Sequence, residues 1–344
     1  MAVLALISAA SVWRIVGADP SQPATGPGAA AEPSMVEQPT GRLVYVGQDG
    51  RLWTWDLVTG RTSRGVRLPG VVTALVDASG AGQGWIGVQT LGRSGSVSAS
   101  VLEGPSDPSL RLLGAGDVAA WGPSGVSVAL ARNGRTDADC PRAEIEVVSV
   151  GTGSGAPGLA PRSLCGPVPS LGRSSAATYV TGTTPDGFGL HETGTVGIPH
   201  LLFGDVRLVS SSPVSAFLLE PETGAPRTLL LWRGTGGPVR FEEDGEPLVV
   251  SRVLAWSGDA LHAAVWGSVG SRAGVFLLEA GPGRGPREPM FVTGIVGVQG
   301  SFAPDGSLFL NTGDGMFRFV GGELRQVPLP AGASAPTGPI LWSP

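Results

Sequence analysis

Lysine is absent from this chain of 344 residues, and all 23 of its basic residues are arginine. This absence excludes Schiff-base catalysis and the lysine of a phosphate-binding P-loop. Charged residues of either sign are also scarce, at 15% of the sequence, and the formal net charge is −5. Because a mildly acidic chain has no electrostatic footprint for phosphate groups, we expect no nucleic-acid partner.

Histidine is nearly missing as well, with only His191, His200 and His262 in the whole chain. Their spacing matches no zinc pattern, so we expect each of them in a strand or a turn rather than in a metal site. The chain also lacks a Gly-x-Ser-x-Gly elbow in a strand-to-helix setting, a His-Glu-x-x-His pair and a Walker sequence. The sequence therefore identifies no catalytic, cofactor-binding or metal-ligating residue.

Two stretches have the composition of a ligand loop without its spacing. The acidic run Glu242–Glu246 places its carboxylates consecutively, whereas calcium loops place them at alternating positions, so we expect a solvated connection between blades. The glycine-rich run Gly151–Gly155 has neither the lysine nor the following helix of a phosphate loop. We expect it to be a flexible loop between strands.

The chain begins with a short apolar run, Ala2–Trp13, followed by Arg14 and the small residues Val16–Ala18. Residues 1–18 are therefore predicted to be a secretory signal peptide or an uncleaved anchor, although no basic segment precedes the run. A buried N-terminal helix is the alternative, since apolar runs of this length also occur in cores. We expect an exported protein of the cell envelope or the extracellular space that touches membrane only through this segment.

The next segment, residues 19–40, is a mixture of proline, alanine and glycine without periodicity, which predicts a disordered linker. Only two cysteines follow, Cys140 and Cys165, and an even number in an exported chain favours a disulfide between them. Two unrelated thiols are the alternative, because the sequence does not show whether the two Cα atoms lie within the roughly 7 Å that a bridge requires.

Glycine and proline are abundant, with 55 and 30 residues, and hydrophobic residues make up 42% of the chain. Disordered chains are poor in apolar residues, so this composition favours a large core interrupted by many turns. Within it, a unit of about 40 to 45 residues recurs, which is the period of propeller blades. Gly116–Gly151 and Gly300–Gly322 show the unit best: a strand, a turn of the form Pro-x-Gly, an alternating strand, a second turn and a further strand.

Seven such units follow one another along residues 41–344. Their predicted bounds are Arg42–Pro69, Val71–Gly114, Gly116–Cys165, Pro167–Gly204, Asp205–Gly245, Pro247–Gly294 and Ile295–Pro330. The first unit lacks its opening strand, whereas the chain ends on an opening strand with nothing after it, Gly338–Pro344. We therefore expect Pro339–Ser343 to supply the inner strand of the first blade and so close a ring without free sheet edges.

The turns of these units resemble those of a known repeat. The sequences at Ala120–Gly125, Ala255–Asp259, Ser301–Gly306 and Leu341–Pro344 are similar to the W-S-P-D-G turn of TolB-like, WD40-like propeller repeats, and Trp55–Gly60 resembles the strand and turn that follow it. The resemblance implies an all-β, seven-bladed propeller, with six or eight blades left open, that serves as an interaction platform. The bias towards Ala, Gly, Pro and Arg also resembles the proteins of high-GC actinobacteria.

Tryptophan is frequent, with nine residues, of which six fall in predicted strands or at their ends: Trp53, Trp55, Trp121, Trp256, Trp266 and Trp342. Trp53 and Trp55 are two residues apart and share one face of a strand. We expect such large rings to wedge neighbouring blades together. An aromatic platform for sugars is the alternative, and it requires exposed rings.

Three functions are compatible with this sequence. The leading hypothesis is a non-enzymatic, extracytoplasmic binding or scaffolding propeller that engages a protein or a cell-envelope component, with no cofactor. The second is a propeller-type hydrolase or lyase that acts on a carbohydrate or small ester in the central channel. The third is a membrane-anchored sensor domain. Fold alone does not decide among them.

Overall fold

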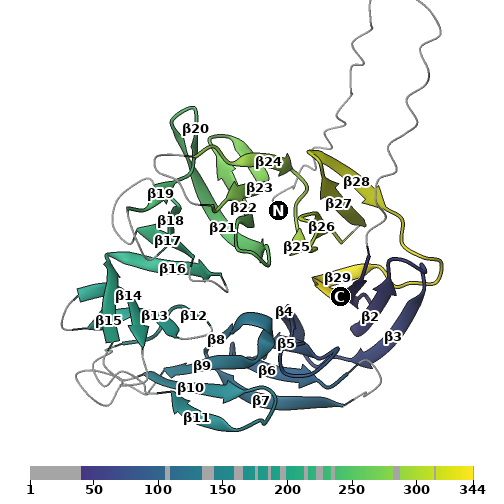
Figure 1. Cartoon of the computed structure of the whole chain (residues 1–344), viewed down its shortest axis with the longest axis horizontal. Coiled ribbons are helices and arrows are strands. Elements are labelled where there is room, and N and C mark those ends of the chain that lie inside the picture. Colours follow the sequence, from purple (N-terminus) through teal and green to yellow (C-terminus); the bar gives the residue numbers. More distant parts are fainter. Residues whose placement is uncertain are drawn as a thin grey trace, which may run out of the picture. The chain divides into compact units, whose positions relative to one another are not determined.

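In the residues that it describes, the computed structural model has 29 strands and one short 3-10 turn, Pro123–Gly125. It describes residues 40–104, 109–133, 143–158, 166–174, 177–184, 187–193, 199–212, 216–221, 228–233, 237–281, 287–313 and 315–343. The strands form seven antiparallel sheets that follow one another around a ring (Figure 1). The predicted seven-bladed β-propeller is confirmed. None of the helical turns in the described ranges is long and apolar enough to cross a membrane.

Six of the seven blades have four strands and one has five. Blade 1 contains β29 (Pro336–Ser343), β1 (Arg42–Gly47), β2 (Arg51–Asp56) and β3 (Thr62–Arg67). Blade 2 contains β4 (Val71–Asp77), β5 (Ile86–Leu91), β6 (Val97–Leu102) and β7 (Leu110–Gly116). Blade 3 contains β8 (Val118–Trp121), β9 (Ser127–Asn133), β10 (Ala143–Ser149) and β11 (Gly155–Gly158). Blade 4 contains β12 (Leu171–Arg173), β13 (Thr178–Thr184), β14 (Gly187–Thr193) and β15 (Pro199–Gly204).

The remaining blades complete the ring. Blade 5 contains β16 (Val206–Ser211), β17 (Phe217–Pro221), β18 (Leu230–Trp232) and β19 (Val239–Arg240). Blade 6 contains β20 (Glu242–Glu243), β21 (Glu246–Trp256), β22 (His262–Val269), β23 (Arg272–Glu279) and β24 (Met290–Thr293). Blade 7 contains β25 (Gln299–Phe302), β26 (Leu308–Asn311), β27 (Met316–Val320) and β28 (Glu323–Val327). Pro39–Pro344 form one compact unit, whereas residues 1–39, Cys140 and Cys165 lie outside the described residues.

The ring is closed by its two ends, as the sequence predicts. Strand β29 pairs antiparallel with β1, in a register that places Arg42 opposite Ser343 and Leu43 opposite Trp342. The indole nitrogen of Trp342 donates to the carbonyl oxygen of Thr40 at 3.0 Å. The last strand is therefore the inner strand of the first blade, and the closure leaves neither terminal strand unpaired.

Two predicted boundaries differ from the structure. Gly116, predicted to open the third unit, instead ends β7 of blade 2. The sequence places Glu242–Glu243 in the fifth unit, but these residues form β20 and pair with the start of β21 in blade 6. The cause is the tight hairpin at Asp244–Gly245, where both residues have positive φ, 52° and 80°. Two consecutive residues of positive φ match the twist of a two-residue hairpin, so the acidic run folds back on itself instead of linking blades.

Tryptophans fill the space between blades, as predicted. Trp55 is 6% exposed, and together with Trp53 and Trp342 it packs into a cluster that joins blade 1 to blade 7 through Phe309 and Met316. Trp121, Trp256 and Trp266 pack into three other clusters. None of these six rings is exposed, so they do not form a platform for sugars.

Polar contacts also connect neighbouring blades. Arg173 on β12 donates to Ser127 Oγ of blade 3 at 3.3 Å, and Trp256 Nε1 on β21 donates to Ser210 Oγ of blade 5 at 3.0 Å. Arg252, also on β21, donates to the carbonyl oxygen of Val298, which precedes blade 7. Inner strands therefore use polar side chains to fix their neighbours, and burial lowers the pKa of both Arg173 and Arg252.

Candidate functional site: a basic groove between blades 1 and 2

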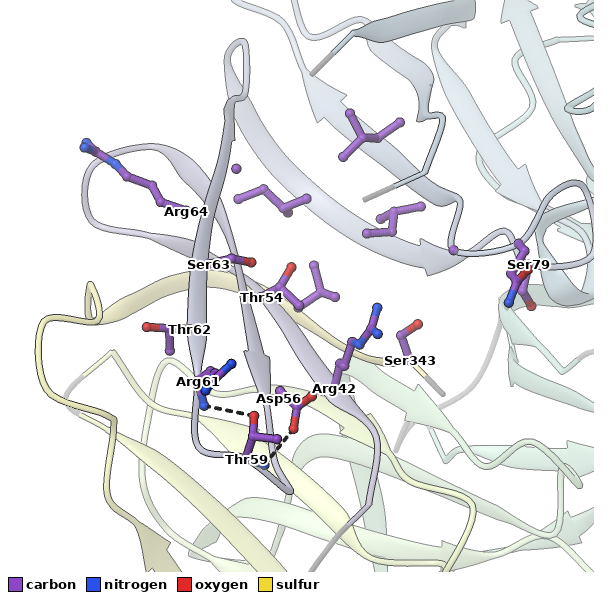
Figure 2. A pocket seen from close by; sticks show the side chains of 17 residues that line it. Arg42, Thr54, Asp56, Thr59, Arg61, Thr62, Ser63, Arg64, Ser79 and Ser343 are labelled. Carbon is purple, nitrogen blue, oxygen red and sulfur yellow. Dashed lines mark hydrogen bonds between the residues drawn. The ribbon is translucent and has the colours of Figure 1, made fainter. Parts of the chain in front are cut away.

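A groove of about 1010 Å³ lies between blade 1 and blade 2 (Figure 2). Blade 1 contributes residues of all four of its strands, and blade 2 contributes β5, β6 and the loop that connects β4 to β5. The lining residues are Arg42, Val44, Leu52, Thr54, Asp56, Thr59, Arg61, Thr62, Ser63, Arg64, Gly65, Ser79, Gln83, Gly84, Ile86, Leu102 and Ser343.

The alternation of strand β2 explains why one side of blade 1 is open. Successive side chains of a strand point to opposite faces. Trp53 and Trp55 fill the face towards blade 7, whereas Leu52 and Thr54 line the face towards blade 2. Opposite Thr54 in the sheet lies Ser63, which is too small to fill the space that the tryptophans fill on the other side.

The floor of the groove is apolar and its rim is basic. Val44, Leu52, Ile86 and Leu102 are all 2 to 7% exposed and belong to the core cluster between blades 1 and 2. Three arginines but only one carboxylate, Asp56, line the groove above them. A groove of this kind favours a ligand that is partly apolar and partly anionic.

The carboxylate of Asp56 is occupied by its own turn. Its Oδ1 accepts hydrogen bonds from the backbone N–H groups of Thr59 at 2.8 Å and of Val58 at 3.0 Å. Hydrogen bonds from the backbone and side chain of Thr59 lower the pKa of Asp56, and the positive charge of Arg42 adds to this. Asp56 therefore stays ionised and fixes the β2–β3 turn, which leaves it little capacity as a general acid.

Two of the three groove arginines are free to bind a ligand. Within the described part of the chain, the guanidinium groups of Arg42 and Arg61 have no hydrogen bond or ion pair, and both residues are exposed. Arg64 is different, because its guanidinium is 3.0 Å from Asp49 Oδ2. Arg42 and Arg61 are therefore the candidate ligand-binding charges of the groove.

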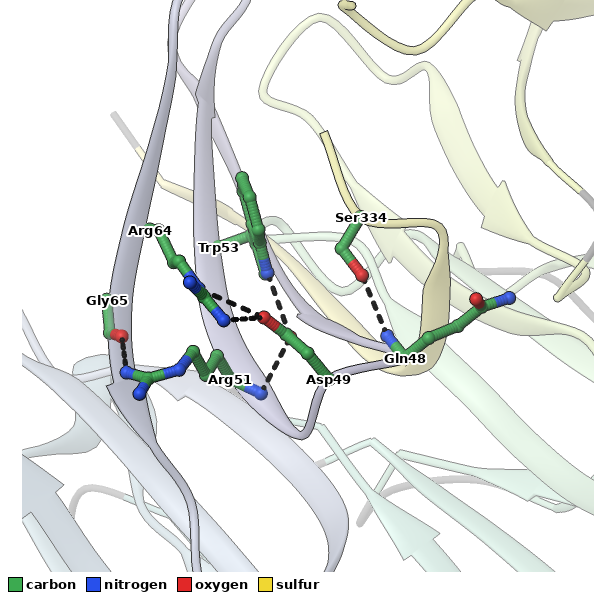
Figure 3. A network of polar contacts seen from close by, with 7 residues as sticks. All are labelled: Gln48, Asp49, Arg51, Trp53, Arg64, Gly65 and Ser334. Carbon is green, nitrogen blue, oxygen red and sulfur yellow. Dashed lines mark hydrogen bonds and ion pairs between the residues drawn. The ribbon is translucent and has the colours of Figure 1, made fainter. Parts of the chain in front are cut away.

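Asp49 pairs with Arg64 as part of a network at the other end of the blade (Figure 3). Its Oδ1 accepts from the indole of Trp53 and from the backbone N–H of Arg51, each at 3.1 Å. The next residue towards the N-terminus, Gln48, donates its backbone N–H to Ser334 Oγ at 3.0 Å. The network thus ties the β1–β2 turn to the edge strand β3 and to the segment that leads into β29.

Acid should weaken the propeller through four carboxylates. The pKa values of Asp49, Asp56, Asp259 and Asp305 are all lowered by hydrogen bonds, which for Asp49 and Asp305 outweigh the opposing effect of burial. A carboxylate whose pKa is lower in the folded state stabilises the fold above its unfolded pKa of about 3.9, and this contribution is lost as the pH falls through the folded value. We expect the free energy of unfolding, measured by urea titration, to fall below about pH 4.

A matched variant tests the source of this acid sensitivity. In Asp305→Asn one of the four carboxylates no longer titrates, so its loss of stability between about pH 5 and pH 3 should be smaller than that of the unmodified chain. Stability that rises on acidification would contradict the assignment.

The three histidines, which are the sequence candidates for a metal or an acid–base site, lie in different places of the fold. His191 is fully buried in β14, with Nε2 3.1 Å from the carbonyl oxygen of Gly182, whereas His200 is exposed in β15 and His262 opens β22 in blade 6. The strand positions predicted for the three histidines are confirmed. In the described ranges, no three residues among His, Cys, Asp and Glu are placed to hold a metal ion.

The inner strands carry few groups suited to catalysis. In the inner strands as the structure describes them, the only carboxylates are Asp77, the last residue of β4, and Glu246, the first residue of β21, on blades that are not neighbours. Asp77 accepts hydrogen bonds from the backbone and the hydroxyl of Ser79 in the following turn. Among the described residues the channel side therefore presents no pair of carboxylates like that of a glycosidase.

Neither Arg42 nor Arg61 was predicted from the sequence, although a signal was present for Arg61. Arginine recurs at every third position from the residue before the outer strand of blade 1 to the end of that strand, at Arg61, Arg64 and Arg67. In a chain with so few charges such a run indicates a basic strand edge. Which of these arginines is available for a ligand depends on Asp49, because only the fold shows that Asp49 pairs with Arg64.

Comparisons with known proteins show the fold. No family model matches this chain, and no curated protein matches it either. Among solved structures, acylaminoacyl peptidase from Pyrococcus horikoshii is 11% identical, with a TM-score of 0.53, over 81% of this chain and 48% of that one. The β-propeller domain of the Trilobed protease from Pyrococcus furiosus, described as having an open velcro topology, is 10% identical, with a TM-score of 0.51, over 83% of this chain and 89% of that one.

TolB from Acinetobacter baumannii also matches, at 13% identity and a TM-score of 0.49, over 88% of this chain and 66% of that one. This chain thus spans about half the length of the peptidase and about two thirds of that of TolB. The resemblance to propeller repeats drawn from the turn sequences is confirmed for the fold.

Proposed function

We propose that this chain is an exported, non-enzymatic binding propeller that engages a protein or cell-envelope component at the groove between blades 1 and 2. The observation that carries the proposal is a pair of exposed arginines, Arg42 and Arg61, above an apolar floor, whose guanidinium groups make no hydrogen bond or ion pair with the described residues. Free charge beside apolar surface is typical of a recognition site. The proposal of export rests on the apolar start of the sequence, Ala2–Trp13.

Binding is favoured over hydrolysis because four of the carboxylates are engaged in structural hydrogen bonds. Asp49, Asp56, Asp259 and Asp305 each accept hydrogen bonds that fix a turn or an arginine. Their lowered pKa values keep them ionised at neutral pH, whereas a general acid needs a raised pKa.

Site-specific crosslinking in cells that express the chain tests this function. A photoreactive amino acid replaces Ser63, which is exposed in the groove, or Arg325, which is exposed on the outer strand β28 of blade 7. We expect one envelope protein, identified by mass spectrometry, to crosslink from position 63 and not from position 325.

The identified partner is then purified and its affinity measured against two variants. Ser63→Trp places a large ring in the groove and should weaken binding at least about tenfold, whereas Arg325→Trp should leave it unchanged. Equal crosslinking from both positions, or an affinity that Ser63→Trp does not change, would refute the groove as the binding site.

A further inference from the structure

The groove opens onto the free edge of a sheet. Four consecutive residues of β3, Thr62 to Gly65, line it, although successive side chains of a strand point to opposite faces. Because the groove contacts residues whose side chains point to both faces of β3, it extends around the edge of this strand. In the described sheet β3 pairs only with β2, so its outer edge has no partner strand.

A free strand edge can accept an extended peptide, because the backbone groups along it are available for a further strand. The side chains on this edge select the charge of that peptide. Arg64 and Arg67 are exposed on β3 and Arg61 is exposed directly before it, and they repel a second copy of the same basic edge. They favour instead a strand that carries carboxylates.

Arg42 and Arg61 are placed where they could bind the carboxylates of such a peptide. Arg42 and Arg61 line the groove at the end where β1 begins and β3 is about to begin, with Arg42 beside Ser343 and Arg61 beside Thr59 (Figure 2). A guanidinium binds a carboxylate through two parallel hydrogen bonds, and no described carboxylate makes a hydrogen bond or an ion pair with either side chain, although the charge of Arg42 acts on Asp56. The apolar floor formed by Leu52 and Ile86 offers a place for one apolar side chain of the same segment.

We propose that the groove binds an extended, acidic peptide segment of a partner protein, with carboxylates on Arg42 and Arg61 and an apolar side chain on the floor. The inference rests on the proposed function and specifies the chemistry of its partner. A peptide explains the apolar floor and the free edge together, whereas an anionic polysaccharide would use only the arginines.

Fluorescence anisotropy with the full chain tests the proposal. The probe is a labelled twelve-residue peptide in which Glu and Val alternate, and the matched peptide has Gln in place of Glu. We expect the Glu peptide to bind, the Gln peptide to bind at least about tenfold more weakly, and added NaCl to weaken the Glu peptide more. Alginate serves as a competitor that carries carboxylates without a peptide backbone.

Variants connect the binding to the named residues. Arg42→Gln with Arg61→Gln should weaken the Glu peptide at least about tenfold, whereas Arg325→Gln, on the outer strand of blade 7, should not. In the described residues neither guanidinium makes a hydrogen bond or an ion pair, and the charge of Arg42 acts only on the exposed turn of Asp56, so the double variant should melt close to the temperature of the unmodified chain.

The outcomes separate this inference from the proposed function. Equal affinity for the Glu and Gln peptides, full displacement by alginate at matched carboxylate concentration, or an unaffected double variant would overturn the acidic peptide. The groove would still be the binding site if Ser63→Trp abolished binding of the crosslinked partner. If Ser63→Trp left that partner bound, the proposed function itself would fail.

Discussion

A chain that lacks residues 338–344 is expected to lose the cooperative thermal unfolding of the propeller. The deletion removes Ile340, Leu341 and Trp342 from β29 together with their pairing to β1. Ile340 is 3% and Leu341 is 9% exposed, and burying a side chain of this size stabilises a fold by about 1.5–3 kcal/mol. Loss of three such residues approaches the whole stability of a typical domain, about 5–15 kcal/mol.

The deletion also exposes the inner edge of β1. An unpaired central strand is a template for association, so we expect the truncated chain to aggregate as well as to unfold at lower temperature. Polar contacts across the seam would be lost too, because the backbone N–H of Trp342 donates to Ser301 Oγ and Asn311 Nδ2 donates to the carbonyl oxygen of Gly338. Blade 7 would thus lose contacts along with blade 1.

Differential scanning calorimetry of two truncated chains checks this expectation. Deletion of residues 19–38, which the sequence predicts to be linker, should leave the melting temperature of the propeller unchanged. Deletion of residues 338–344 should abolish the transition or lower it by at least about 10 °C. Equal melting of the C-terminally truncated and full-length chains would show that the ring does not depend on this seam.

The blade count and the seam could be predicted because each rests on local signals. A turn such as Ser301–Gly306 marks the end of an inner strand wherever it occurs, and the unmatched opening strand Gly338–Pro344 leaves one place for closure. The boundary at Glu242–Glu243 was wrong for a local reason as well. An acidic run looks like a solvated connection until the backbone at Asp244–Gly245 is known to form a tight hairpin.

The groove could not be predicted in the same way, because it is a property of two packed blades. Thr54 and Ser63 are unremarkable in sequence, and they make a cavity only where they face Ile86 and Leu102 of blade 2. The sequence also does not show that Arg61 lacks an ion pair. Any arginine of the run could have paired with Asp49, and in the structure that carboxylate pairs with Arg64.

Replacement of Gly125 by alanine should cost far more stability than the same change at Gly306. The two glycines hold the same place in the Pro-x-Gly turns of blades 3 and 7, and both have positive φ, 61° and 81°. A side chain in that conformation costs about 1–2 kcal/mol at either position. At Gly306 nothing lies within 4 Å of an added Cβ, so this cost is the whole expected effect.

At Gly125 an added Cβ would lie 2.6 Å from the Cα of Ala78 and 2.7 Å from the carbonyl oxygen of Asp77. Both contacts are with the backbone at the end of β4, so the turn of blade 3 would have to move away from blade 2. Overpacking of this kind adds about 1–3 kcal/mol, which gives a total of about 2–5 kcal/mol for Gly125→Ala. Urea unfolding of the two variants measures the difference; equal losses would show that the glycine serves only the turn and not the contact between blades.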